Sequence, residues 1–307
     1  MTLQSSGQIS ANNINVELGK SGTAQFSLND ADGRSLVGKP SSGSQISYSD
    51  FYGKSLVFNV PLVISANTTN YSLSTAVSSY TSTHGWNGTS KLAITLTINS
   101  GVYVYSTSTG SYALTLSGSY PSGSTIVVTN NGYIIGKGGN GGSQYWFYYS
   151  AHPATNGGNG GPAVFANVPL TFYNYGSIAG GGGGGGGAGS VTYEYYNPAL
   201  GKQYASYSGG QGGGGASYGA GGSVTTPFFS ETAPSGGLTT GGAGSNFGGA
   251  GGNMGSAGAD GQTWVQPPQG DLYGYDPDGL GGAAGNAVVG IAYITVGNTG
   301  TVLGGVV

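Results

Sequence analysis

The side chains of this sequence with the clearest chemical potential are carboxylates in its second half. Cleavage of a glycosidic bond needs two carboxyl groups positioned on either side of that bond. The second half has six acidic residues, and no two of them form a recognisable pair: Glu194, Glu231, Asp260, Asp271, Asp276 and Asp278. His84 and His152 have no acid or nucleophile at a telling spacing, so turn or surface roles fit them better. We therefore expect that the protein is not an enzyme, and hydrolysis is the weaker alternative.

Metal and cofactor sites are also not expected. Asp30–Gly33 and Asp276–Gly279 look like fragments of calcium loops, but the closing Glu of such a loop is missing. Calcium takes about six to eight oxygen ligands, and turn formation accounts for both Asp-Gly pairs. The chain has no Cys, which removes disulfides and thiolate ligands.

Aromatic residues concentrate in four segments of the second half. Rings combined with Ser, Gly and Asn are typical of binding surfaces, because rings give a large contact area with few rotatable bonds. We interpret these rings as candidate binding residues: Tyr145, Trp146, Phe147, Tyr148, Tyr149, Tyr193, Tyr195, Tyr196, Tyr204, Tyr207, Phe228, Phe229, Trp264, Tyr273 and Tyr275. The alternative is that some of these rings cover neighbouring glycine runs, which have no side chains of their own.

Runs of glycine separate these aromatic segments. Only 14 of the 66 glycines precede residue 135. Six runs follow: Gly136–Gly142, Gly157–Gly161, Gly180–Gly189, Gly209–Gly222, Gly241–Gly261 and Gly279–Gly285. Without Cβ atoms, extended helices with three residues per turn can lie in backbone contact and share N–H and C=O groups. The runs therefore predict a polyglycine II bundle, with the aromatic segments as loops at its ends. The recurring GGNGG segments would place Asn140 and Asn159 on an outer edge or a polar seam.

Collagen, a disordered linker and a phosphate-binding loop fit the glycine runs less well. Collagen needs a strict Gly-X-Y period and abundant Pro, and the chain has 12 Pro. A disordered linker does not need aromatic inserts. The segment Gly132–Lys137 has one residue too few for a phosphate-binding loop and lacks the following Ser or Thr.

Residues 56–135 predict a β-rich domain. Ile94, Leu96 and Ile98 alternate with Thr, the period of a half-buried strand. Turn residues recur at a spacing near ten residues, which favours a small antiparallel sandwich or a solenoid. Alternation returns in residues 287–307, through Val288, Ile291, Tyr293 and Ile294, and predicts a closing strand.

Residues 1–55 predict a small module with short helices. Ser10 is placed to cap a helix carrying Ile14 and Leu18, and Gly19 is placed to end it. Ser27 is placed to cap a second helix with Leu28 and Leu36 as apolar anchors. Residues 46–55 read as a strand or turn into a third short element. A core this small rarely stands alone, so we expect the module to fold against a partner or another copy of itself.

Composition narrows the classes of partner. The seven Lys and Arg residues are spread thinly, whereas binding to nucleic acid needs clustered cations. No apolar stretch is long enough for a membrane span, so we expect no membrane insertion. The N-terminus has neither a basic region nor an apolar core, so we do not expect a signal peptide. A protein assembled in the cytoplasm and released by lysis fits these features.

Three segments resemble structural proteins of tailed bacteriophages. Residues 7–54, which include GQISANNINVELG and FSLNDADGRSLVGK, resemble an N-terminal module of tailed-phage structural proteins. Leu96–Gly142 resembles the stretch that leads into glycine-rich tips of tail fibres and host-specificity proteins. Ala287–Val307 resembles the closing strand of those tips.

The resemblance implies a receptor-binding tail fibre tip, or adhesin, with a polyglycine II bundle and receptor-binding loops. Its partners would be a protein or glycan on the bacterial outer surface and, through residues 1–55, other virion proteins. A homotrimer is one assembly open to such a chain. Because the first module lies on the same chain, the alternative is a head fibre or decoration protein on the capsid surface. We thus expect a mainly β fold with an N-terminal docking module (1–55), a β-rich domain (56–135) and a glycine-rich adhesin domain (136–307).

Overall fold

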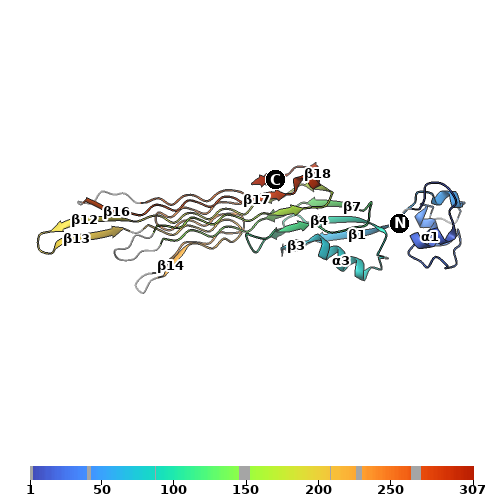
Figure 1. Cartoon of the computed structure of the whole chain (residues 1–307), viewed down its shortest axis with the longest axis horizontal. Coiled ribbons are helices and arrows are strands. Elements are labelled where there is room, and N and C mark those ends of the chain that lie inside the picture. The colour runs from blue at the N-terminus through green and yellow to red at the C-terminus, as the bar shows by residue number, and fades with distance from the viewer. Residues whose placement is uncertain are drawn as a thin grey trace. The chain divides into compact units, whose positions relative to one another are not determined.

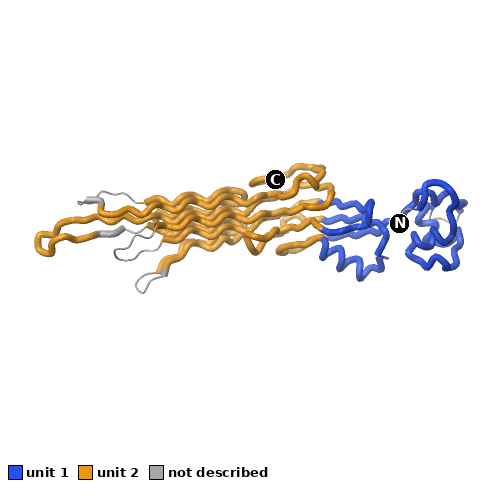
Figure 2. Tube along the Cα trace, in the orientation of Figure 1, with its two compact units in different colours: residues 1–62, 74–96, 118–128 blue, residues 63–73, 97–117, 129–307 orange. Residues whose placement is uncertain are grey.

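The computed structural model describes residues 3–39, 43–86, 88–144, 153–207, 209–225, 230–263 and 271–307. The structure is mainly β with few helices, which confirms the expected class. The chain divides into two compact units (Figure 2). Unit 1 comprises residues 1–62, 74–96 and 118–128, and unit 2 comprises residues 63–73, 97–117 and 129–307. The three successive domains expected from the sequence stay a prediction.

The first helix of unit 1 is the one that the sequence predicts. Helix α1 (Ala11–Glu17) has Ser10 as its N-cap. The Ser10 Oγ accepts from the Asn13 N–H, and the Asn13 Oδ1 accepts from the Ser10 N–H, so the two residues form a capping box. Ile14 then points into a small core with Leu3, Ile9, Val37 and Phe51. This part of unit 1 therefore has a core of its own.

The second helix begins later than predicted. Helix α2 (Ala31–Leu36) has Asp30 as its N-cap, so the assignment of Ser27 as the cap is wrong. The Ser27 N–H donates to Asp30 Oδ2 (3.0 Å) and the Ser27 Oγ accepts from the Asn29 N–H (3.2 Å), which closes a turn ahead of the helix. The third short element is the 3₁₀ helix η1 (Tyr48–Phe51).

One helix of the structure was not predicted. Helix α3 (Leu73–Thr83) consists mostly of Ser and Thr, which favour caps and turns over helix interiors. Its buried positions Leu73, Val77 and Thr81 are four residues apart, and this spacing was the available signal. The Thr81 Oγ1 donates to the Val77 carbonyl at 2.9 Å, so the hydroxyl is satisfied within the helix.

Unit 2 contains a β-solenoid with three sheets. The sheet of the longer strands has the order β1-β4-β7-β10-β18, and its first three strands enter unit 2 with their last residues. The other two sheets have the orders β19-β11-β8-β5-β2 and β20-β17-β9-β6-β3. The strand bounds are β1 (Val57–Ile64), β2 (Thr68–Thr69), β3 (Tyr71–Ser72), β4 (Lys91–Ile98), β5 (Tyr103–Tyr105), β6 (Leu114–Leu116), β7 (Thr125–Asn130), β8 (Tyr133–Ile135), β9 (Val164–Ala166), β10 (Leu170–Asn174), β11 (Ser177–Ala179), β17 (Asn286–Val289), β18 (Ile294–Asn298), β19 (Thr301–Leu303) and β20 (Gly305–Val306).

Each coil of the solenoid contributes one strand to each sheet. The pairs β2–β5, β5–β8, β8–β11 and β11–β19 are parallel, as are β3–β6, β6–β9, β9–β17 and β17–β20. The solenoid prediction is therefore right and the antiparallel alternative is wrong for these pairs. Apolar side chains fill the interior, among them Val104, Leu114, Ile134 and Val164, all with no exposed surface.

Stacked asparagines close one corner of the solenoid. The last residues of β7, β10 and β18 are Asn130, Asn174 and Asn298. The Asn130 Nδ2 donates to Asn174 Oδ1 (2.8 Å), and the Asn298 Nδ2 donates to the Asn174 carbonyl (3.1 Å). Each Asn begins an Asn-Xaa-Gly segment in the sequence, a repeat that could have revealed the coils before the structure did.

The final segment of the chain is not one closing strand. Ile291–Tyr293 form the 3₁₀ helix η2 between β17 and β18, so the strand alternation predicted through these residues is wrong. Gly290, with φ of 89°, turns the backbone into this helix. The turn starts the last coil, which β18, β19 and β20 complete.

The glycine runs leave the solenoid at equivalent points of two successive coils. One insertion lies between β8 and β9, and the other lies between β11 and β17. Each insertion takes the place of the short connection between a strand of the β19-β11-β8-β5-β2 sheet and the next strand, which belongs to the β20-β17-β9-β6-β3 sheet. In Figure 1 the inserted runs extend side by side from the part of unit 2 that is labelled β17, away from β18.

Residues 180–188 are the best-connected of these runs. All nine are buried, and seven other segments are hydrogen-bonded to them, one of which is β19, where the Leu303 carbonyl accepts from the Gly180 N–H (3.0 Å). The N–H groups of residues 181–188 donate to three segments in turn, at 2.8–3.2 Å. Gly181, Gly184 and Gly187 donate to residues 155–161, and Gly182, Gly185 and Ala188 donate to residues 210–216. Gly183 and Gly186 donate to residues 256–259. The carbonyl groups accept from residues 139–142, 249–255 and 279–285 at 2.7–2.9 Å. The same neighbour recurs every third residue.

Backbone contact explains why glycine occupies these positions. A Cβ atom on Gly183 would lie 1.8 Å from the Gly282 carbonyl oxygen, and one on Gly184 would lie 1.9 Å from that of Asn140. Real Cβ atoms do not approach so closely, so a side chain here would push two backbones apart.

Asparagine and aspartate side chains line the outer edges of the runs. The Asn140 Oδ1 accepts from the Ala220 N–H (3.1 Å), and the Asn159 Oδ1 accepts from the Ala283 N–H (2.9 Å). Both residues are exposed, so of the two positions predicted for them, an outer edge or a polar seam, they occupy the outer edge. Asn156, Asn253 and Asp260 accept from other backbone N–H groups in the same way. Polar side chains thus satisfy donors at the rim.

Candidate functional site

The inserts between the glycine runs carry strands at the far end of unit 2. Strands β12 (Val191–Asn197), β13 (Gly201–Tyr207) and β16 (Asp271–Tyr275) form an antiparallel sheet of order β13-β12-β16. Strands β14 (Ser223–Thr225) and β15 (Ser230–Thr232) form a separate hairpin. Figure 1 shows both sheets at the end of the runs that lies away from β17. We call the β13-β12-β16 sheet the tip sheet.

Local sequence explains the β12–β13 hairpin. The Asn197 Oδ1 accepts from the N–H groups of Ala199 (2.9 Å) and Leu200 (3.2 Å), which closes the turn. Gly201 follows with φ of 76°, a conformation that favours glycine. The hairpin then pairs Val191–Asn197 with Gly201–Tyr207 without a register shift.

Polar side chains hold the tip sheet to the glycine runs. The Asp276 Oδ2 accepts from Ser190 Oγ (2.6 Å), where β12 and β16 leave the runs. The Asp278 Oδ1 accepts from the Gly189 N–H (2.7 Å) and from Thr263 Oγ1 (2.6 Å). Two of the six acidic residues that were weighed as hydrolytic candidates are therefore engaged in fixing strands in place.

A buried pair of glutamines holds the first insert. The Gln144 N–H donates to Gln211 Oε1 (3.0 Å), and the Gln211 Nε2 donates to the Gln144 carbonyl (3.2 Å). Both residues are almost fully buried. The sequence did not predict this pair, although both glutamines stand beside glycine runs.

One face of the tip sheet combines rings with an ion pair. Glu194 lies opposite Tyr204 in the register of β12 and β13. The Lys202 Nζ is 2.8 Å from Glu194 Oε1, and the ring of Tyr273 is 4.7 Å from that of Tyr204. A register shift in the β12–β16 pairing lies next to Tyr273, where a bulge redirects side chains.

Hydrogen bonds shift the pKa values of this group. Those from Lys202 and then Tyr204 lower the pKa of Glu194 below its usual value. The hydrogen bond to Glu194 raises the pKa of Tyr204, and the same carboxylate raises the pKa of Lys202. All three groups are solvent-accessible, so these are surface interactions with a small effect on stability.

Four of the candidate binding residues are well exposed on the tip sheet. The exposed fractions are 40% for Tyr195, 73% for Tyr196, 63% for Tyr273 and 56% for Tyr275. Tyr193 is only 7% exposed, and Tyr204 is half-buried, so these two rings pack within the sheet. Leu200, which was not a candidate, is 70% exposed in the hairpin turn.

The remaining candidates belong to segments that the structure does not describe. Tyr145, Trp146, Phe147, Tyr148, Tyr149, Phe228, Phe229 and Trp264 lie outside the described residues, as does the side chain of Tyr207. His152 also lies outside them.

His84 stacks on Tyr80 with ring centroids 3.9 Å apart, at the end of α3. In the described parts of the chain, no three His, Cys, Asp or Glu residues are grouped as metal ligands. No helix there is long and apolar enough to cross a membrane.

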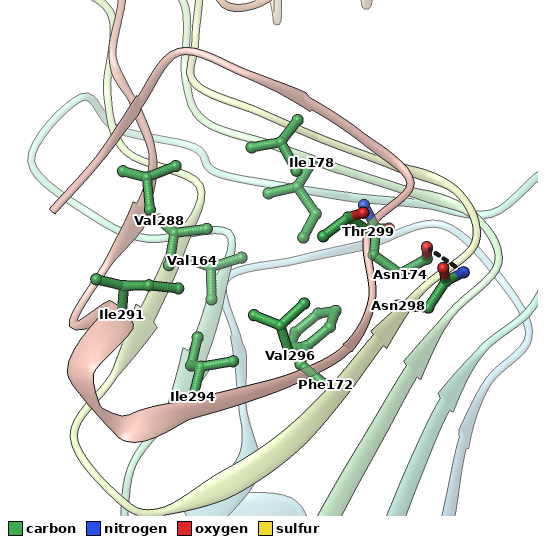
Figure 3. A pocket seen from close by; sticks show the side chains of 12 residues that line it. Val164, Phe172, Asn174, Ile178, Val288, Ile291, Ile294, Val296, Asn298 and Thr299 are labelled. Carbon is green, nitrogen blue, oxygen red and sulfur yellow. Dashed lines mark hydrogen bonds between the residues drawn. The ribbon is translucent and has the colours of Figure 1, made fainter.

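An apolar pocket lies in the solenoid. Figure 3 shows its apolar side chains, which include Phe172, Ile178, Val288 and Val296 from the last two coils. Its volume is about 200 Å³. The pocket continues the apolar interior of the solenoid, and no titratable residue lines it. It therefore offers no chemistry of its own.

Comparison with known proteins assigns the chain to a family. Residues 59–307 match the family of the phage tail fibre adhesin Gp38. The chain therefore belongs to the phage tail fibre adhesins, proteins that bind a receptor from a tail fibre. The family assignment does not favour the alternative of a head fibre or decoration protein.

A solved structure shares the fold. The chain is similar to one from the crystal structure of the gp37-gp38 adhesin tip complex of the long tail fibre of bacteriophage S16. The two chains are 21% identical, and the similarity covers 99% of this chain and 100% of that one, with a TM-score of 0.53. No curated protein sequence matches the chain significantly.

Proposed function

We propose that the exposed rings of the tip sheet bind a receptor on the outer surface of the host bacterium. The observation that carries this proposal is the exposure of Tyr195, Tyr196, Tyr273 and Tyr275, which is 40–73% on one small sheet. Exposed apolar area of this kind marks interaction surfaces, and Tyr is enriched among residues that dominate binding energy. The candidate rings that lie outside the described residues, in segments 145–149, 228–229 and 264, belong to the same proposal.

The runs beneath the tip sheet act as a rigid scaffold in this proposal, a bundle of polyglycine II helices. The supporting observation is the three-residue period with which residues 181–188 bond to six neighbouring segments. Three residues per turn is the period of an extended helix of this type. A scaffold without side chains leaves the inserts free to differ in sequence while their ends stay fixed.

Residues 1–55 dock the chain to the rest of the virion in this proposal. They contain a separate small core, and the family match begins only at residue 59. The similar chain is part of a complex of two tail fibre proteins, which supports a tail fibre protein as the docking partner. Catalysis has no part in the proposal, and the carboxylates of Asp276 and Asp278 accept hydrogen bonds from Ser190, Gly189 and Thr263 at the base of the tip sheet.

Adsorption of the parent phage tests the receptor proposal. The purified full-length chain should bind host cells and block phage adsorption. Replacing Tyr195, Tyr196 and Tyr275 by Ser should raise the Kd at least about thirtyfold, which corresponds to about 2 kcal/mol. The control is Tyr175→Ser, because Tyr175 is 61% exposed on the solenoid and should not contribute to binding. Unchanged binding by the triple variant, or an equal loss in the control, would contradict the proposal.

A further inference from the structure

The glycine-rich part of the chain carries charge of predominantly one sign. Residues 1–137 contain six Lys or Arg and four acidic residues, a net charge of +2. Residues 138–307 contain six acidic residues and one Lys, a net charge of −5. The whole formal charge of −3 thus arises from a negative half that includes the tip sheet.

The single ammonium of this half is already engaged. Lys202 is 2.8 Å from Glu194, so this pair is close to neutral as a unit. The other five carboxylates have no Lys or Arg within residues 138–307 to compensate them. Those whose contacts are described accept from neutral donors: Glu231 from Asn246 Nδ2, Asp260 from the Gly281 N–H, and Asp276 and Asp278 at the base of the tip sheet. Neutral donors satisfy the oxygens and leave the negative charge in place.

Exposed rings stand next to this negative charge. Tyr273 and Tyr275 are 63% and 56% exposed, and Asp276 and Asp278 follow them directly in the chain. Glu231 lies in β15, in the neighbouring hairpin of the same end. Ring faces attract ammonium and guanidinium groups, and carboxylates form charged hydrogen bonds with them. Phosphate groups are negative, so these carboxylates would repel them, and such repulsion costs free energy at an interface.

We propose that the tip sheet binds a cationic protein segment, an extracellular surface loop with exposed Lys or Arg side chains. The proposal rests on the receptor-binding function above and specifies the chemistry of the partner. Opposite charge would steer the tip towards such a loop and raise the association rate. Rings of the tip sheet would then cover the aliphatic stems of the Lys or Arg side chains.

Salt dependence of binding to outer-membrane vesicles tests this inference. Vesicles from cells that adsorb the parent phage are immobilised, and association of the full-length chain is measured from about 10 mM to about 150 mM salt. The Debye length falls from about 30 Å to about 8 Å across this range. We expect the association rate to fall by about tenfold or more, while the dissociation rate changes less. Vesicles treated with protease should lose binding, and vesicles with truncated surface polysaccharide should keep it.

Charge variants give matched controls. Glu231→Gln together with Asp276→Asn removes both charges, keeps one acceptor oxygen on each side chain and should lower the low-salt association rate several-fold. Lys202→Gln should raise that rate, whereas Lys91→Gln, the same charge change in unit 1, should not alter it. An association rate that is independent of salt, or that rises with salt, would overturn the inference, as would binding that survives protease and follows the polysaccharide. Absence of binding at every salt concentration would instead refute the receptor-binding function itself.

Discussion

The solenoid and the glycine runs of unit 2 are built on opposite principles. In the solenoid, large apolar side chains such as Ile134 and Leu114 fill the space between sheets. In the runs, the space between neighbours is only wide enough for hydrogen-bonded backbone, and residues 180–187 are all Gly. The first region loses stability when atoms are removed, and the second loses stability when atoms are added. This contrast can be tested by substitutions, from the largest expected effect to the smallest.

Adding one methyl group to the central run should have the largest effect. In Gly183→Ala, the new Cβ would lie 1.8 Å from the Gly282 carbonyl oxygen. Neither backbone can move without breaking hydrogen bonds to further neighbours, so we expect a loss of more than about 3 kcal/mol, the upper range for overpacked cores. Denaturant unfolding measures the change. Gly110→Ala is the control, since the nearest atom to its Cβ would be 3.9 Å away. Equal stability of both variants would contradict the contrast.

Removing atoms from the solenoid should have the next largest effect. Ile134 has no exposed surface, so Ile134→Ala would leave a cavity and cost about 2–5 kcal/mol. The same measurement on Val63→Ala should show a change of about 0.5 kcal/mol or less, because Val63 is 62% exposed. A small effect at Ile134 would mean that side-chain packing does not hold the coils together.

The two regions also differ in how far the sequence predicts them. Three-residue spacing in GGNGG placed Asn140 and Asn159 on the rim, because a backbone bundle leaves side chains only one direction in which to point. The solenoid appeared only as one of two alternatives, since alternation of Ile94, Leu96 and Ile98 is the same in parallel and antiparallel sheets. Parallel pairing depends on contacts between coils, for which the Asn-Xaa-Gly repeat was the unused signal.

The candidate site was predictable in composition and not in detail. Runs of rings identified the inserts, but whether a ring is exposed depends on where it lies in the folded sheet. Tyr193 and Tyr195 are two residues apart in β12, yet they are 7% and 40% exposed, because Tyr193 lies nearer the base of the sheet. Helix α3 shows the same limit, since tertiary contacts at Leu73 and Val77 override weak helix propensity.

Rim side chains of the runs should contribute a smaller amount. In Asn159→Ala, the Ala283 N–H loses its acceptor, and we expect a loss of about 0.5–1.5 kcal/mol. Water can reach this exposed group, which favours the lower end of that range. Asn159→Asp keeps an oxygen at the same position and should retain the stability in the same unfolding assay. A loss as large as that of Gly183→Ala would mean that the rim, and not the central run, holds the bundle.

The smallest expected effect is a pH dependence of stability at Asp50, which lies in unit 1 and belongs to neither the solenoid nor the glycine runs. The hydrogen bond from Lys39, followed by that from the Ser47 N–H, lowers the pKa of Asp50 from 3.8 to about 2. Because the folded pKa is depressed, the carboxylate stabilises the fold fully above pH 3.8, and the contribution is lost as the pH falls towards 2. Melting curves of the wild type and Asp50→Asn should converge in this window. Curves that stay parallel would contradict the lowered pKa.

Hydrogen exchange of the glycine amides tests most directly whether bonded backbone makes a rigid scaffold. Amides of residues 181–187 donate to partners at 2.8–3.2 Å and are buried, so they should be as strongly protected as those of the solenoid strands. Protection should also extend to the runs that surround them. Exchange of these amides at the rate of an open chain, while the solenoid stays protected, would show that the runs are flexible and would contradict the rigid scaffold.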